Sequence, residues 1–518
     1  MGFCKRMVRR VQNRKINFKI ESNTKNMNKF LTISTVILLN LMLVFSAKAQ
    51  IKLPAILSSN MVLQRNTTIN LWGWAAPSEK ISIKTSWTKN QLNIAANNDG
   101  TWKVNIVTTN SKEPQKISIK SKTSNILLEN ILFGEVWLCS GQSNMQMPLK
   151  GNEGEPVIGS STAIMNSNNK NLRFFTVERN SSKTPLNNIE KYKGWAQSSP
   201  ETAANFSAVA YFFGQQLQQI LDVPVGLIHS SWGGSSVEAW MSSETLGEYQ
   251  TVNLKDVDIS VKTNTIPTVL FNAMIYPIIP YTIKGGLWYQ GETNRNNPEN
   301  YKKLFPAMVK DWRARWNLGD FPFYYTQIAP FTYQNNQAIE VEKNSAFMRE
   351  AQLECLNLIP NSGIAITLDV GDARSIHPPK KKEVADRLLM NALNQTYGFK
   401  SIKYKSPTYD FKEIKENGIL IKFKNIELGI YAFDTLENFE IAGEDKVFYP
   451  AIAKIVNNKS ILVSSSSVKN PIEVRYAWKN FVKASLFDNA LLPLSSFRTD
   501  KWYDATHNYI EKNETDKK

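Results

Sequence analysis

Ser143 is the residue in this sequence best placed to act as a nucleophile. It follows an apolar run at 136–139, which predicts a short buried strand, and a break at Ser140 and Gly141. A serine just beyond a buried strand can project its hydroxyl into a cleft, where backbone N–H groups face a developing oxyanion. The same position also suits a serine that caps a helix. The residues that follow the other predicted strands distinguish a nucleophile from a helix cap.

Three further predicted strands, at 225–228, 286–289 and 364–368, end in polar or glycine-rich loops. The loops that follow them contain His229 with Gly233 and Gly234, then Gln290 and Asn294, then Asp369, Asp372 and His377. Parallel strands bring their carboxyl ends to one edge of a sheet. A hydroxyl, a glycine pair, side-chain amides and an Asp/His loop at that edge are the components of an acyl-transfer site.

The general base has to be one of the chain's three histidines. His507 lies in a polar tail, and His229 ends a strand near Ser143, where it could line the pocket or, less favourably, act as the base. His377 lies before two prolines, which stiffen its loop and would hold one tautomer in place. We expect His377 to be the base, oriented by Asp372, with Asp369 or a backbone carbonyl as alternatives.

Composition excludes several classes of protein. The chain has 518 residues and a formal net charge of +17, but without the ten basic residues and one acidic residue of positions 1–49 the charge falls to +8. The remaining basic residues are dispersed, so a nucleic-acid partner is not expected. Three histidines and three cysteines, without metal-binding spacings, predict neither a metal site nor a disulfide framework. No cofactor is expected.

The first 49 residues resemble an export signal rather than part of the fold. A basic stretch at 27–29 precedes an apolar segment at 30–45, and Ala47-Lys48-Ala49 fits a cleavage site before Gln50. At about 16 residues the apolar segment is short for a membrane span. We expect residues 1–26 to be a mis-called extension, and the mature protein to be periplasmic or extracellular with no membrane association.

The mature chain divides into three parts by pattern. Alternating apolar and polar residues separated by turns predict an N-terminal β-sandwich-like domain at 50–132. Strands alternating with amphipathic helices, such as the apolar periodicity over 206–221, predict an α/β domain with a parallel sheet at 133–400. Short strands return in a C-terminal β-rich domain at 401–505, followed by a polar tail at 506–518.

These blocks resemble those of the SGNH (GDSL-type) hydrolases. Their residue sequences are similar to those of the sialate O-acetylesterase family and its acetylxylan-esterase relatives. The matching segments cover most of residues 50–500 and read MVLQR, GEVWLCSGQSNM, GLIHSSWGGSSVEAWM, GLWYQGETN, IHPPKK, VRYAW and SFRTD. The resemblance implies a flavodoxin-like catalytic domain between β modules and a secreted serine esterase that removes O-acetyl groups from carbohydrates, most plausibly of the sialate 9-O-acetylesterase type.

Carried over by position, the resemblance makes Ser143 the nucleophile and His377 the base. The oxyanion hole would combine the backbone N–H groups of Ser143 and Gly234 with an amide from Gln290 or Asn294. The third block departs from the G-x-N-D spacing of simple SGNH enzymes, and Arg374 stands where those enzymes place the aspartate. The orienting carboxylate and the amide donor therefore stay open.

Residues flanking the nucleophile and the glycine pair are expected to contact the substrate, namely Gln142, Asn144, His229 and Trp232. That substrate would be an acetylated sugar or glycan. An acetylxylan or other plant-glycan acetylesterase is the alternative activity, and a non-catalytic carbohydrate-binding protein is a further one. A lipase-type elbow is disfavoured, because Asn144 and Met145 follow Ser143 where that motif needs a glycine. Nothing in the sequence fixes an oligomeric state.

Overall fold

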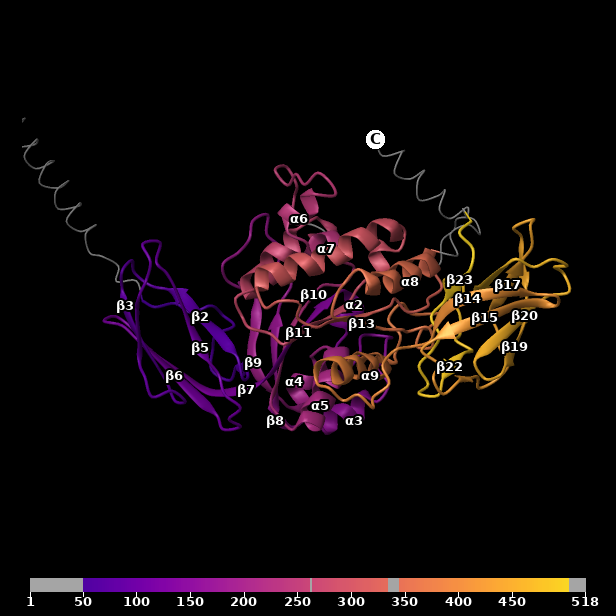
Figure 1. The fold of residues 1–518 in the computed structure, drawn as a ribbon. Coiled ribbons are helices and arrows are strands. Elements are labelled where there is room, and N and C mark those ends of the chain that lie inside the picture. Colours follow the sequence, from indigo (N-terminus) through magenta and orange to yellow (C-terminus); the bar gives the residue numbers. More distant parts are fainter. Residues whose placement is uncertain (1–49, 261–262, 334–343, 503–518) are drawn as a thin grey trace, which may run out of the picture.

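The computed structural model describes residues 50–260, 263–333 and 344–502. They form three parts in a row: an N-terminal β part, a central sheet covered by helices, and a C-terminal β part (Figure 1). The expected signal segment at 1–49 and most of the expected tail, with His507, lie outside the described residues. Within the described residues, no helix is both long and apolar enough to cross a membrane.

The central sheet has the strand order β13-β12-β11-β7-β10-β8-β9. Its neighbouring strands pair in parallel, except that β8 and β9 are antiparallel. The predicted parallel sheet is thus a mixed one with an antiparallel edge. The strands are β7 (Asn125–Gly141), β8 (Asn169–Val177), β9 (Tyr192–Ser198), β10 (Val225–Ser231), β11 (Gly285–Tyr289), β12 (Phe323–Thr326) and β13 (Ser362–Ala365).

Helices bury both faces of this sheet. On one face lie α5 (Ala208–Leu221) and α9 (Lys381–Asn391), and on the other α7 (Pro298–Trp316) and α8 (Asn344–Glu354) (Figure 1). Successive residues of β7 therefore face different helices: Trp137 packs on Phe213 of α5, with ring centroids 5.2 Å apart. Burial on both faces explains why the strands are apolar without alternation. The shorter helices are α2 (Ser143–Gln146), α3 (Ser160–Met165), α4 (Pro200–Ala204) and α6 (Ser243–Gly247).

Strand β7 joins the N-terminal part to the central sheet without a break. It pairs with β6 and β1 through its first half and with β10 and β11 through its second. The expected boundary at 132/133 therefore falls inside a strand. The N-terminal strands are β1 (Val62–Gln64), β2 (Thr68–Trp74), β3 (Lys80–Thr85), β4 (Leu92–Ala95), β5 (Thr101–Val107) and β6 (Gln115–Lys120). Trp72 and Trp102 are buried in their core.

The C-terminal part contains two four-stranded sheets, ordered β14-β15-β20-β19 and β18-β17-β21-β23, and the pair β16–β22. A buried ion pair between Arg475 and Asp500, 2.8 Å apart, ties the last described residues to the second sheet. The strands are β14 (Thr408–Lys415), β15 (Gly418–Lys424), β16 (Ile430–Tyr431), β17 (Phe439–Ala442), β18 (Phe448–Pro450), β19 (Ile452–Val456), β20 (Ser460–Ser464), β21 (Glu473–Tyr476), β22 (Phe487–Asp488) and β23 (Phe497–Arg498).

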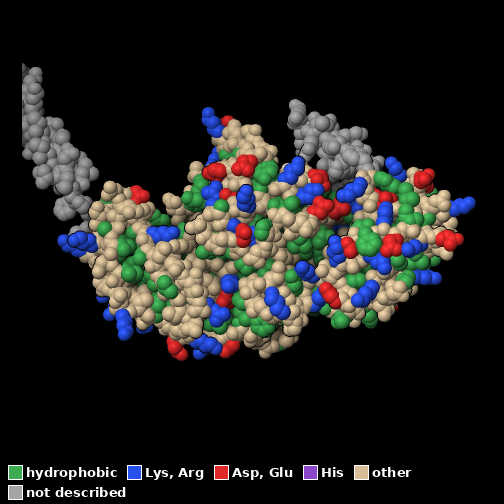
Figure 2. Space-filling model, viewed as in Figure 1, with side chains coloured by type: hydrophobic (Ala, Val, Ile, Leu, Met, Phe, Trp, Pro, Cys, Tyr) green, Lys and Arg blue, Asp and Glu red, His purple; other side chains and the backbone are tan. Residues whose placement is uncertain are grey.

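Charged side chains are dispersed over the surface in Figure 2, with basic and acidic groups interspersed on the face shown. The two described cysteines, Cys139 and Cys355, are buried free thiols, as the sequence predicts. Burial raises the pKa of both thiols. They therefore belong to the core rather than to a reactive site.

Candidate active site

Ser143 begins the short helix α2 directly beyond the end of β7. The connection turns at Gly141, whose φ is 136°, and a side chain there would meet the Tyr289 carbonyl oxygen of β11 at 2.2 Å. Only glycine fits that position. The tight turn leaves Ser143 partly exposed while Gln142 and Asn144 on either side of it are buried. The hydroxyl therefore stands at the carboxyl end of the sheet, as the sequence predicts.

A pocket of about 650 Å³ brings Ser143 and His377 together; we call it the Ser143 pocket. His229, Ser231 and Gly233 also line it. Within the described residues no hydrogen bond joins Ser143 to His377. In enzymes without substrate this contact is often long and closes only in the substrate complex. The predicted nucleophile and base thus share one cavity.

His377 is held in place by a carboxylate that the sequence did not single out. Its Nδ1 lies 2.7 Å from Glu155 Oε1, and its backbone N–H donates to Ser375 Oγ at 3.0 Å. Ser375 Oγ in turn donates to Glu155 Oε1 at 3.1 Å. Partial burial raises the pKa of Glu155, but hydrogen bonds from Asn152 and His377 outweigh it and leave that pKa below its ordinary value. The carboxylate is therefore ionised at neutral pH.

The predicted orienting residues, Asp372 and Asp369, are engaged elsewhere, so that expectation was wrong. Asp372 Oδ1 accepts the backbone N–H of Arg374 at 2.7 Å and closes its own turn. Asp369 forms a bidentate pair with Arg387 of α9, with both contacts at 2.7 Å. Glu155 lies 222 residues before His377 and comes from a different loop. No local spacing could have indicated it.

The glycine pair lies beside the nucleophile. The Gly233 N–H donates to Gln146 Oε1 at 3.0 Å, and a Cβ on Gly233 would lie 3.3 Å from the Ser143 Cβ. Gly234 has a φ of 69°, which favours glycine. In the described residues the backbone N–H groups of Ser143 and Gly234 donate to no protein acceptor. Both remain free for an oxyanion.

Gln290 and Asn294 do not line the Ser143 pocket. Gln290 is fully buried, and its amide donates to Ser235 O at 3.0 Å and to Asn294 Oδ1 at 2.7 Å. Asn294 donates to Glu238 Oε2 at 3.0 Å. Both hydrogens of the Gln290 amide are thus used, one on the loop after the glycine pair and one on Asn294 in the loop after β11. Neither predicted amide donor faces the pocket in this structure.

Gln142 and Asn144, expected to touch substrate, are instead buried and connect loops. Asn144 Nδ2 donates to Glu292 Oε1 at 2.6 Å and to the Ile376 carbonyl at 3.0 Å, while Lys381 Nζ donates to Asn144 Oδ1. Gln142 Oε1 accepts the Gly291 N–H at 3.3 Å. Asn144 therefore links the loop after β7 to the loop after β11 and to the base loop. We call Glu292, Asn144 and Lys381 the buried clamp.

The charges of the buried clamp are perturbed by their surroundings. Burial lowers the pKa of Lys381 to about 7, against the opposing influence of Glu292 and Glu155. Burial likewise raises the pKa of Glu292, although Asn144, His377 and Lys381 oppose this. A lysine and a glutamate this deeply buried next to a candidate active site are a common sign of function.

His229 and Trp232 are placed differently from each other. His229 lines the Ser143 pocket, but it is buried, and burial lowers its pKa to about 4. Its Nε2 lies 2.6 Å from Ser231 Oγ, so one ring nitrogen is engaged. Trp232 does not line this pocket; it lines a neighbouring cleft, where the Arg179 guanidinium lies 6.0 Å from its ring. Of these two residues, only His229 lines the pocket that contains Ser143.

No group of three or more His, Cys, Asp or Glu side chains is arranged to hold a metal ion in the described ranges 50–260, 263–333 and 344–502. The candidate site consists of a hydroxyl, an imidazole, a carboxylate and free backbone donors. This set can carry out nucleophilic acyl transfer with protein groups alone.

Comparisons with known proteins agree with this chemistry. Residues 133–377 match the family model described as carbohydrate esterase, sialic acid-specific acetylesterase. The chain is 28% identical over 472 residues to a sialate O-acetylesterase of Pongo abelii, covering 84% of this chain and 88% of that protein. A sialate O-acetylesterase of Mus musculus is 27% identical, with coverages of 84% and 90%.

The structural comparison gives the same result over the whole fold. The crystal structure of a carbohydrate acetylesterase from Xanthomonas citri superimposes with a TM-score of 0.79 and 31% sequence identity. The match covers 87% of this chain and all of that one. The similarity therefore extends through the β parts on both sides of the central sheet.

Proposed function

The chain belongs to the sialate O-acetylesterase family of carbohydrate esterases and is a carbohydrate O-acetylesterase, and we propose that Ser143, His377 and Glu155 carry out its reaction. Ser143 is the nucleophile, His377 the general base and Glu155 the orienting carboxylate. The observation that carries this assignment is the 2.7 Å contact between His377 Nδ1 and Glu155 at a pocket that also contains Ser143.

In the proposed mechanism, Ser143 attacks the acetyl carbonyl while His377 Nε2 takes the hydroxyl proton. The Nδ1–H donates to ionised Glu155, which stabilises the imidazolium. The backbone N–H groups of Ser143 and Gly234 receive the oxyanion. His377 then passes the proton to the sugar oxygen, which leaves as a hydroxyl group. Water, deprotonated by His377, attacks the acetyl-serine and releases acetate, regenerating Ser143.

We propose that the central sheet is of the flavodoxin-like SGNH type. Numbered in chain order, the strands β10-β7-β11-β12-β13 run 2-1-3-4-5, which is the flavodoxin-like order. The edge strands β8 and β9 lie beyond this set. The division into an N-terminal β part, a central domain and a C-terminal β part belongs to the same proposal, with β7 crossing the first boundary.

The substrate proposed is an O-acetylated sialic acid, with acetylated xylan or another plant glycan as the second candidate. Acetate release from a panel of acetylated sialic acids, acetylated xylan and a long-chain ester tests this directly. The proposal predicts release from acetylated sugars and none from the long-chain ester. Failure to release acetate from any sugar would contradict it.

Glu155→Gln is expected to lower kcat by about 10²–10⁴ with little change in KM, because the imidazole loses the partner that holds its tautomer. Asp372→Asn is the matched control, since Asp372 only closes its own turn. Steady-state kinetics for both variants distinguish the two carboxylates. A larger loss in Asp372→Asn than in Glu155→Gln would reverse the assignment.

Lys381→Met is expected to destabilise the fold by about 1–3 kcal/mol, because it leaves Asn144 Oδ1 without its donor and removes the positive charge that acts on buried Glu292. Lys382→Met, on the next residue of α9, removes an exposed pair with Asp386 and should cost at most about 0.5 kcal/mol. Urea unfolding measures both.

The double variant Lys381→Met/Glu292→Gln tests whether the buried clamp acts as a unit. Removing both charges should restore part of the stability lost in Lys381→Met, since no unpaired buried charge remains. Strictly additive losses would show that Lys381 and Glu292 do not interact.

We also propose export, with removal of the signal before Gln50, based on the sequence pattern alone. Expression in a host with a secretion pathway, followed by N-terminal sequencing of the secreted protein, should give a start at Gln50 or within a residue or two of it. A start at Met1 or Met27 would count against cleavage at this site.

A further inference from the structure

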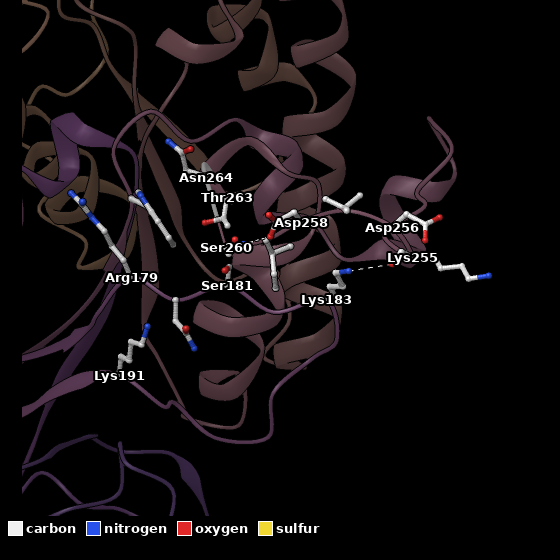
Figure 3. Close-up of a pocket in the computed structure, with 14 residues that line it drawn as sticks. Arg179, Ser181, Lys183, Lys191, Lys255, Asp256, Asp258, Ser260, Thr263 and Asn264 are labelled. Atoms are coloured by element: carbon white, nitrogen blue, oxygen red, sulfur yellow. Dashed lines mark hydrogen bonds between the residues drawn. The ribbon is translucent and has the colours of Figure 1, made fainter.

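A second, larger cavity adjoins the Ser143 pocket. It has a volume of about 850 Å³ and is lined mainly by residues of the segments 179–183, 255–260 and 263–264 (Figure 3). Arg179 and Lys191 line both cavities. Both volumes are in the range of ordinary ligand pockets. We call the second cavity the basic cleft.

Arg179 is held close to the nucleophile by Gln146. Its Nη2 donates to Gln146 Oε1 at 2.7 Å, and the same oxygen accepts the Gly233 N–H beside Ser143. Its guanidinium also lies 6.0 Å from the centre of the Trp232 ring. The Gln146 side chain therefore links the Arg179 guanidinium to Gly233, which lies beside Ser143.

The partners of Arg179 are neutral, and Lys191 has no ion pair in the described part of the chain. A guanidinium has five N–H donors, of which the bond to Gln146 uses one. Figure 3 shows Arg179 and Lys191 on the same side of the basic cleft. Lys183, by contrast, points to the Lys255 carbonyl, 3.2 Å away, near the acidic residues Asp256 and Asp258. The cationic end of the basic cleft is thus the end that meets the Ser143 pocket.

The carboxylate of Glu178 does not neutralise the positive charge of Arg179 and Lys191. Glu178, which lines the Ser143 pocket, lies 4.0 Å from Lys193 on the adjacent strand β9. Arg179 and Lys191 stay available to an anion from outside. Planar bidentate donors such as arginine match carboxylates in particular, and the half-exposed Trp232 offers an aromatic face suited to a sugar ring.

We propose that Arg179 and Lys191 bind a carboxylate of the substrate, so that the enzyme selects acetylated sugars that carry an acid group over neutral ones. This inference rests on the proposed function and narrows its substrate class. The carboxylate can belong to the acetylated sugar itself or to the unit next to it, and both sources present the same chemistry. The basic cleft gives room for the adjoining unit.

The test compares matched substrates by acetate release. One pair is an O-acetylated sugar acid and the same sugar with the carboxylate converted to a primary amide. The other pair is a neutral acetylated sugar linked to an acid unit or to the amide of that unit. Wild type should prefer the acid of at least one pair by about tenfold to hundredfold in kcat/KM, as for charge-assisted hydrogen bonds. The pair that shows the preference identifies the source of the carboxylate.

The variants assign the preference to residues. In Arg179→Gln/Lys191→Gln, the ratio of kcat/KM for the acid to kcat/KM for the amide should fall close to one, mainly through KM. Arg179→Lys should retain part of the preference, because the positive charge stays while the paired N–H donors of the guanidinium are lost. Lys170→Gln is the control: it removes an exposed charge from β8, the strand that leads to Arg179, lines neither cavity, and should keep the ratio. Added salt should lower the wild-type ratio, because both cations are exposed.

Each outcome separates the inference from the function it rests on. Equal hydrolysis of acid and amide by wild type, or a preference that survives the double variant, would overturn the role of Arg179 and Lys191 while leaving the esterase proposal intact. Absence of acetate from every substrate would instead contradict the proposed function.

Discussion

Ser143→Ala is expected to abolish acetate release, lowering kcat by about 10⁴–10⁶, the usual loss when a serine nucleophile is removed. The hydroxyl lies in the Ser143 pocket, beyond the end of β7 and near the backbone N–H groups of Ser143 and Gly234, which donate to no protein acceptor in the described residues. The fold should persist, since Ser143 is partly exposed and its hydroxyl makes no hydrogen bond within residues 50–260, 263–333 and 344–502. Initial rates on an acetylated sugar, with circular dichroism to check folding, measure this.

Ser140→Ala is the matched control for this experiment. Ser140 lies three positions earlier in the same segment, and its buried hydroxyl has no hydrogen-bond partner among the described residues. Replacing it should leave both stability and turnover near the wild-type values. Ordinary turnover by Ser143→Ala, with Ser235 or Ser236 acting instead, would contradict the assignment of the nucleophile.

His377→Ala is expected to be about as damaging as Ser143→Ala, because the two residues act as a unit. Without the imidazole, Ser143 loses its general base, and the leaving sugar loses its proton donor. The Ser143→Ala/His377→Ala double variant should be little worse than either single one. Kinetics of the three variants test this non-additivity.

His229 provides the comparison for the base. It lines the same pocket, but burial holds its pKa near 4, so it cannot carry the proton at neutral pH. His229→Asn should therefore cost no more than about tenfold, in line with a residue that only shapes the pocket. A greater loss in His229→Asn than in His377→Ala would make His229 the base.

The sequence predicts the architecture well where the signal is local. The apolar periodicity over 206–221 corresponds to α5, and the apolar run beginning at 225 corresponds to β10. It misses that β7 runs on across position 132/133. At this position β7 pairs with β1, with Val62 opposite Leu132 and Leu63 opposite Phe133. Partners some 70 positions away leave no periodic trace in a single sequence.

The site is predictable only in part, for a similar reason. Ser143 and His377 stand out because each follows a strand in a loop of unusual composition. Glu155 is brought to His377 by the tertiary fold, and its loop has no feature that marks it. Asn144 was expected at the substrate because it adjoins the nucleophile. Its side chain instead turns inward to Glu292 and Lys381, and sequence adjacency does not reveal that direction.

The central claim is that Ser143, activated by His377, forms the covalent acyl-enzyme. Its most direct test is reaction of the protein with an organophosphate serine-hydrolase inhibitor, followed by peptide mass spectrometry to locate the adduct. If His377 activates Ser143, a single peptide should carry the phosphoryl adduct, and the adduct should be on Ser143. It should be absent in Ser143→Ala and should form far more slowly in His377→Ala. An adduct on Ser140, Ser231 or Ser235, or labelling of Ser143 at the same rate in His377→Ala, would contradict it.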